Sequence, residues 1–342
     1  MDPQTPRPWP TADVDALVRA AMDRATIPGV AVAAVRRGEV VHEAAYGRAS
    51  LELDVPATPA TVFPIASVTK LFTATVAMRE VEAGRLDLDG PIGGYLDDLP
   101  AAWRAVTPRQ MLAHMSGLPD VIVDPMAGTW LAERYDDAIA AAARQPCPFE
   151  PAAAWSYNQT NFVLLAAIVE RLAGRPLAAL VDAAIVAPLA LTATTYGDAR
   201  DVVPGRGPWY SRIDFSGPQP RLADRLHAIW VPYPPLAHPC AGLNTTAIEL
   251  ARFVDAVASG RLVRPATRDA MWTPQQLRDG TPAGPDPSSP MGLGWIVESL
   301  DGRTLVGGSG GATVAVRHCV PDGLTVAVLT NCQGCDPDGL AT

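Results

Sequence analysis

The chain has 342 residues, of which 48% are hydrophobic and 18% charged, and its formal net charge at pH 7 is −9. The negative balance and the dispersed arginines argue against a nucleic-acid-binding surface. The sequence carries no apolar stretch long enough for a membrane span or a secretory signal. Five cysteines do not make the framework of a small disulfide-rich protein. We therefore expect a globular cytoplasmic protein without nucleic-acid or membrane partners.

The chain begins with a predicted helix and two strands. The spacing of apolar residues predicts a helix over 11–25, a strand over 29–35 and, after a turn, a second strand over 40–46. A loop rich in proline and threonine follows. The next helix is predicted to begin at Ser67 and to end at Gly84, because a glycine after the last apolar turn is a common helix stop. Ser67 is therefore expected at a helix N-terminus.

The middle of the chain is predicted to be mainly helical. Strand patterns are missing between about residues 86 and 190, and apolar residues recur there at helical spacing. The predicted helices cover 108–114, 136–143 and 161–173.

A long segment rich in proline and aromatic residues follows at 196–239. Loops of this length inside a compact protein are usually functional. We expect this one to cover the cleft and to select an apolar or aromatic substrate, through Trp209, Tyr210 and Trp230.

The last third of the chain returns to strands. Thr246 and Glu249 have the spacing of a capping box, which predicts a helix that ends at Gly260. Four short antiparallel strands are then predicted over 293–297, 304–306, 313–317 and 324–330. Neither this group nor the N-terminal pair of strands is large enough to be stable alone, so we expect them to share one sheet.

The order of these elements predicts an α+β fold. Residues 1–85 and 240–342 would form a discontinuous sheet domain, and residues 86–239 would be inserted as a mainly helical domain. A catalytic cleft is expected where the two domains meet.

Lys70 is the only lysine in the chain, beside 26 arginines, and it stands three positions after Ser67. Arginine supplies a fixed positive charge but does not lose its proton at neutral pH, whereas a buried or crowded lysine does. Residues three apart lie on one face of a helix, so the two side chains can meet as base and nucleophile. A surface lysine left by an arginine-biased composition is the alternative interpretation.

Ser67 and Lys70 form an SxxK motif, and further segments occur around it in a familiar order. They are 27–32, 63–70, 84–89, 111–119 and 291–295. With them the chain resembles the serine beta-lactamase and penicillin-binding protein superfamily, in the branch of class C beta-lactamases, DD-peptidases, D-aminopeptidases and family VIII-type esterases. The resemblance implies a beta-lactamase-like fold, an antiparallel sheet flanked by helices, and acyl transfer without a cofactor.

The second motif of the superfamily, Tyr-x-Asn, is matched at 157–159. The resemblance implies that Tyr157 exchanges protons with the leaving group and later with the attacking water. The third position is Gln159, where the superfamily usually has Asn. Its amide lies one methylene further out, which changes its reach towards Lys70 or a substrate carbonyl.

The third motif, Lys-Thr-Gly or His-x-Gly, is matched by a run of small residues at 307–311. The resemblance implies an oxyanion hole formed by the main-chain N–H groups of Ser67 and Gly311, with Gly308, Ser309 and Gly310 beside the substrate. Gly308 stands at the basic position. A substrate carboxylate would therefore find no matched cation there, which argues against peptidoglycan stem peptides and ordinary beta-lactams.

Arg317 and His318, on the following strand, are candidates to replace the missing cation, although alternation sends one of them away from the site. His114, with Asp120 or Asp124, invites a Ser-His-Asp interpretation, but the resemblance places it at a structural helix end.

Cys332 and Cys335 form a CxxC pair without the further ligands that zinc requires. No metal site and no cofactor are predicted.

The predicted function is hydrolysis of a small-molecule carboxylic ester through an acyl-enzyme on Ser67. A D-stereospecific amidase or aminopeptidase, acting on small amides, and an acyltransferase would use the same residues. A catalytically inactive binding homologue is the remaining alternative, raised by Gly308 and Gln159.

Overall fold

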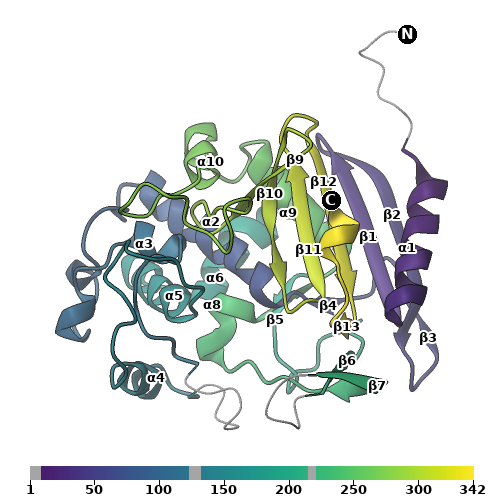
Figure 1. Cartoon of the computed structure of the whole chain (residues 1–342), viewed down its shortest axis with the longest axis horizontal. Helices are drawn as coiled ribbons and strands as arrows, with labels where there is room; N and C mark the ends of the chain where they lie inside the picture. Colours follow the sequence, from purple (N-terminus) through teal and green to yellow (C-terminus); the bar gives the residue numbers. More distant parts are fainter. Residues whose placement is uncertain (1–8, 123–131, 215–220) are drawn as a thin grey trace.

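The computed structural model describes residues 9–122, 132–214 and 221–342 and has the predicted α+β architecture, an antiparallel sheet flanked by helices (Figure 1). Its main sheet is antiparallel, with the strand order β3-β2-β1-β12-β11-β10-β9. These strands are β1 (Gly29–Arg36), β2 (Glu39–Ser50), β3 (Val55–Pro56), β9 (Ile296–Leu300), β10 (Arg303–Gly310), β11 (Val314–Cys319) and β12 (Leu324–Thr330). The N-terminal and C-terminal strands therefore share one sheet, as expected.

Strand β1 lies inside the sheet, between β2 and β12, and is buried on both faces. Its pairing with β12 places Ala33 opposite Ala327. Because side chains alternate along a strand, Val30 and Val32 face one side while Ala31 and Ala33 face the other. Helices α1 (Thr11–Ala25) and α11 (Asp338–Ala341) cover the first face, and α9 (Ala247–Ala258) covers the second.

The helical part of the molecule lies beside the second face of the sheet (Figure 1). Its helices are α2 (Thr69–Glu82), α3 (Pro108–Leu112), α4 (Tyr135–Ala142), α5 (Thr160–Ala173), α6 (Leu177–Val181), α7 (Ala187–Leu189), α8 (His238–Ala241) and α10 (Pro265–Met271). Short 3-10 turns occur at Ala66–Val68 (η1), Ile92–Gly94, Ala101–Trp103 and Pro235–Ala237, and a π-helical turn lies at Asp182–Val186.

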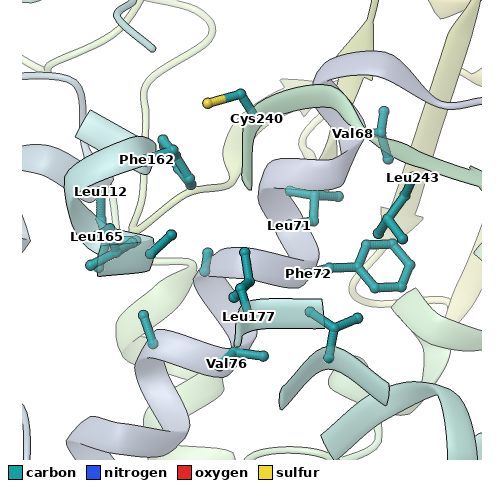
Figure 2. Packing of buried hydrophobic residues seen from close by; sticks show 14 of the residues in the cluster. Val68, Leu71, Phe72, Val76, Leu112, Phe162, Leu165, Leu177, Cys240 and Leu243 are labelled. Carbon is teal, nitrogen blue, oxygen red and sulfur yellow. The ribbon is translucent and has the colours of Figure 1, made fainter. Parts of the chain in front are cut away.

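Helix α2 is buried on almost all sides. Figure 2 shows its Leu71, Phe72 and Val76 among apolar side chains from the surrounding segments, including Phe162 on α5 and Cys240 on α8. One apolar cluster runs without a break from β11 and β12 through α2 into α5. The two predicted domains share this core. Their division at residues 85 and 240 stays a prediction.

The proline-rich segment differs from the predicted loop. It contains β6 (Trp209–Asp214) and β7 (Arg221–Ile229), which pair antiparallel, and β6 also pairs with β13 (Cys332–Gln333). The prolines at 208 and 232 flank these strands and do not interrupt them. The strands therefore form in a segment for which the sequence predicted only a loop. A second small sheet joins β4 (Phe63–Pro64), β8 (Leu243–Thr245) and β5 (Thr195–Tyr196) among the described residues.

Two predicted helix starts differ in detail. Ser67 lies in the turn η1, and the α-helix proper begins at Thr69. Thr246 caps α9 by accepting a hydrogen bond from the Glu249 N–H, but the Glu249 carboxylate does not complete the box. It accepts instead from the Ala193 N–H and the Thr194 hydroxyl, because these approach from a neighbouring segment.

Among the described residues no single helix is long and apolar enough to cross a membrane. The bent pair Thr160–Ala173 and Leu177–Leu189 meets the length and composition criteria only when both helices are counted together.

Candidate active site

The turn that carries Ser67 has a strained backbone. Ala66, just before it, has a φ of +43°, in the left-handed region that residues other than glycine rarely adopt. Strand β4 leads into this turn and α2 leaves it, so the half-buried Ser67 side chain is held between two fixed elements. Strain of this kind is often found at functional sites.

Lys70 lies one turn further along and reaches Ser67, as its spacing predicts. Its Nζ donates to Ser67 Oγ at 3.4 Å and to the main-chain oxygen of Cys240 at 3.0 Å. The side chain is only 4% exposed, and Nζ lies 4.8 Å from the centre of the Tyr157 ring. Within the described ranges Lys70 makes no ion pair with a carboxylate, and the groups that its Nζ binds, the Ser67 hydroxyl and the Cys240 carbonyl, are neutral.

Tyr157 approaches the same oxygen from the helical side. Its Oη donates to Ser67 Oγ at 2.7 Å, and 42% of the residue is exposed to solvent. The three predicted catalytic side chains therefore meet at one oxygen atom, although Tyr157 is 90 residues from Ser67 in the sequence.

His114 lies behind Tyr157 and does not touch Ser67. Its ring is 4.6 Å from the Tyr157 ring centre, and its Nδ1 accepts from the Asn158 N–H at 3.2 Å. Burial and the nearby charge of Lys70 lower the pKa of His114 to about 3. The position favours the structural interpretation. Asp120 accepts a hydrogen bond from the Gln159 N–H instead of pairing with His114, and Asp124 lies outside the described residues.

The glycines of β10 come into very close contact with the serine turn. A Cβ atom added at Gly310 would lie 2.5 Å from the main-chain oxygen of Ile65 and 2.8 Å from the amide nitrogen of Ser67. Only glycine permits this approach. Gly311 follows with a φ of +59°. The two predicted donors of the oxyanion hole, the N–H groups of Ser67 and Gly311, therefore belong to segments that are neighbours in space.

Gly308 has no charged side chain, and neither Arg317 nor His318 on β11 places a cation beside Ser67. A Cβ at Gly308 would meet only the Leu71 side chain. Arg317 points to the opposite face of the sheet, where it pairs with Glu298 and Asp338 at 2.7 and 2.6 Å. His318 is buried against Thr325 and Trp272, and burial lowers its pKa to about 4.

Two predicted substrate-binding side chains need correction. Ser309 Oγ donates to Asp338 Oδ1 at 2.5 Å and accepts from Arg317, so it faces α11 and not the serine. Tyr210 is buried, and its hydroxyl pairs with Glu52 and accepts from the Leu51 N–H. The cause is the same in both cases, since alternation along β10 and β6 turns these side chains away from those of their neighbours.

Trp209 and Trp230 line a pocket of about 160 Å³ next to the serine turn. Pro64, Tyr233 and Ala241 belong to the same walls. Pro64 leads into the Ser67 turn, and Ala241 follows Cys240, whose carbonyl binds Lys70. The pocket therefore adjoins the site.

Gln159 lies at the start of α5, close to the site through its main chain. Its carbonyl oxygen accepts from the Cys240 thiol at 3.5 Å. Cys332 and Cys335 are free thiols, and the described residues contain no group of three or more His, Cys, Asp or Glu side chains placed to hold a metal ion.

Sequence reasoning missed several residues of the site. The Cys240 carbonyl that binds Lys70 belongs to no motif, and main-chain groups leave no signal in residue type. Tyr233 and Arg206 lie in the pocket wall. Both belong to the segment rich in proline and aromatic residues, but neither matches a motif. The clustering of aromatic residues was the one available signal.

Comparisons with known proteins agree with this geometry. Residues 14–341 match the Beta-lactamase family. A D-aminopeptidase of Brucella canis is 29% identical over 335 residues, which cover 94% of this chain and 60% of that protein. Esterase EstB of Burkholderia gladioli is 27% identical over 341 residues, which cover 86% of this chain and 81% of the esterase.

Among solved structures, a D-stereospecific amidohydrolase from Streptomyces sp. superposes with a TM-score of 0.77 at 26% identity, over 95% of this chain and 96% of that one. The chain spans 60% of the length of the Brucella D-aminopeptidase that it matches. The family match covers nearly the whole chain and includes the serine, lysine and tyrosine that meet at one oxygen. The protein therefore belongs to the Beta-lactamase family, and a D-aminopeptidase and an esterase are among its relatives.

Proposed function

We propose that this protein hydrolyses small carboxylic esters through an acyl-enzyme on Ser67. The observation that carries the proposal is the meeting of two proton-carrying groups at the serine oxygen. Tyr157 Oη and Lys70 Nζ lie 2.7 and 3.4 Å from Ser67 Oγ. A serine hydroxyl becomes a strong nucleophile only when a base within hydrogen-bond reach takes its proton.

In the proposed reaction Lys70 takes the Ser67 proton while Oγ attacks the ester carbonyl. The negative charge that develops on the carbonyl oxygen lies between the N–H groups of Ser67 and Gly311. Tyr157 gives a proton to the departing alkoxide, so that an alcohol leaves and the acyl group stays on Ser67. The phenolate left on Tyr157 then takes a proton from water as the water oxygen attacks the acyl-enzyme, and Lys70 returns its proton to Ser67 Oγ as the acid leaves. Tyr157 is partly exposed, so this water has a path to the site.

A D-stereospecific amidase is the second candidate, because the Brucella and Streptomyces relatives bear such names. A D-amino-acid amide carries an ammonium group that needs a carboxylate partner. The carboxylate that lines the pocket among the described residues is Asp198, and Arg200 already binds it through Nε at 2.8 Å and through its main-chain N–H. This favours esters.

Intact-mass spectrometry separates these possibilities. The protein is mixed with an aryl ester, a D-amino-acid amide or a penicillin, and the mass added to Ser67 is recorded. We expect an adduct with the ester that is absent from Ser67→Ala. A larger turnover of the amide would instead support the amidase, and transfer to an added alcohol would support an acyltransferase. An inactive binding homologue forms no adduct with any of the three.

A further inference from the structure

The pocket beside Ser67 combines flat apolar walls with one guanidinium group. Trp209, Ile229, Trp230 and Tyr233 provide apolar surface, and Arg206 lies among them. The volume of about 160 Å³ is close to that of cavities that hold a single benzene ring. The size and the aromatic walls fit one ring of a substrate.

Arg206 is half-buried and has no carboxylate within ion-pair distance in the described parts of the chain. Its guanidinium donates to two neutral acceptors, Asn244 Oδ1 at 3.3 Å and the main-chain oxygen of Asp201 at 2.6 Å. A guanidinium has five N–H donors, so these two bonds leave donors for a ligand. Burial lowers the pKa of Arg206, and the charges of Asp201 and Asp198 offset this in part.

The acidic neighbours of Arg206 are engaged elsewhere. Asp198 pairs with Arg200 at 2.7 Å, and Asp201 accepts a hydrogen bond from the Asp198 N–H at 2.8 Å. Among the groups that line the pocket, Arg206 is thus the charge left for an incoming anion. A planar guanidinium binds carboxylates in a two-pronged geometry.

The pocket lies where one part of a substrate bound at Ser67 would reach. A Cβ built at Gly311 would be 3.7 Å from the Trp209 ring, and Pro64 and Ala241 connect the pocket wall to the Ser67 turn and to the carbonyl that binds Lys70. Gly308, on β10, supplies no cation. A substrate anion would therefore be held on the Arg206 side of the site.

We infer that this pocket binds an aromatic or similarly flat part of the substrate that carries a carboxylate, and that Arg206 pairs with this carboxylate. The inference rests on the proposed ester hydrolysis at Ser67 and names its substrate class. It makes Arg206 a residue that determines specificity.

Two pairs of esters test the inference. The acyl side is compared with para-nitrophenyl benzoate and its para-carboxybenzoate counterpart, and the alcohol side with phenyl acetate and para-carboxyphenyl acetate. The quantity of interest is the ratio of kcat/KM for the charged ester to that for the neutral ester. In one of the pairs Arg206→Gln should lower this ratio by about tenfold to a hundredfold, as expected for a lost charge-assisted hydrogen bond.

Two further variants serve as controls. Arg206→Lys keeps the charge and should recover part of the ratio. Arg221→Gln removes the same charge from an arginine that pairs with Asp214 on the exposed strands, and should keep the wild-type ratio. An unchanged ratio in Arg206→Gln for both pairs overturns the inference, while adducts on Ser67 would still support the proposed function.

If no ester acylates Ser67, binding decides the question independently. Benzoate and benzamide are titrated while the tryptophan fluorescence is followed, since Trp209 and Trp230 line the pocket. We expect benzoate to bind the wild type more tightly than benzamide, and Arg206→Gln to lose the difference. Equal binding of the two probes to the wild type contradicts the inference.

Discussion

The contact between β10 and the serine turn predicts that one added methyl group will disable the site. In Gly310→Ala the new Cβ would lie 2.5 Å from Ile65 O, 2.8 Å from Ser67 N and 3.0 Å from Val68 N. All three are main-chain atoms and cannot swing aside as a side-chain end does. The strand must therefore retreat by about 1 Å to reach ordinary contact distance.

A retreat of this size moves the Gly311 N–H away from the oxyanion. Losing one such donor lowers kcat by about a hundredfold to a thousandfold, and overpacking of this kind destabilises a protein by about 1–3 kcal/mol. Both quantities can be measured, by steady-state hydrolysis of an aryl ester and by urea unfolding.

Gly308→Ala provides a matched control on the same strand. Its Cβ would lie 3.4 Å from the Leu71 side chain, which is normal contact, and neither glycine has a positive φ. We expect a much smaller fall in kcat for this variant. If Gly310→Ala keeps wild-type kcat, or if both variants lose activity equally, the proposed role of the close contact is refuted.

Three further predictions follow from the described contacts. Lys70→Arg should lower kcat by about a thousandfold and abolish the Ser67 adduct in intact-mass spectra, because arginine does not accept the serine proton. The control Arg85→Lys, an exchange at an exposed position, should have little effect on kcat. Arg317→Met should destabilise the protein by about 3 kcal/mol in urea unfolding, because it leaves Glu298 and Asp338 without their buried partner; Arg303→Met, which removes an exposed pair with Asp322, should cost under about 1 kcal/mol. The depressed pKa values of His114 (about 3) and His318 (about 4) mean that below pH 6.5 the unfolded chain takes up protons that the folded chain does not. Stability should therefore fall between pH 6.5 and about pH 4, by about 1 kcal/mol per pH unit for each histidine, and His318→Gln should show a shallower pH dependence of the urea midpoint.

The sequence contained enough information for the fold and for the centre of the site, for reasons that differ between residues. Ser67 and Lys70 could be paired from local geometry alone, because three positions along a helical turn bring side chains together. Tyr157 could be added only through resemblance to a known superfamily, since no local rule connects residues 90 positions apart.

The surroundings of the site could not be predicted in the same way. The directions of Ser309 and Tyr210 depend on strand register, which residue type alone did not reveal. Arg206 matches no motif, and its place in the pocket follows from a tertiary bridge between Val62 and Arg206. Such contacts form between distant segments and are visible only in the folded chain.

The pairing of β1 with β12 has a consequence for biosynthesis. A ribosome releases β1, β2 and the nucleophile turn long before β10 and β12 exist, so the growing chain holds β1 with one open edge. Pairing of such distant strands is slow, and open edges favour aggregation. The glycine segment that completes the surroundings of Ser67 lies on β10, among the last strands to be made. We therefore expect no catalytic activity in a nascent chain. Activity should appear only when translation and folding are both complete.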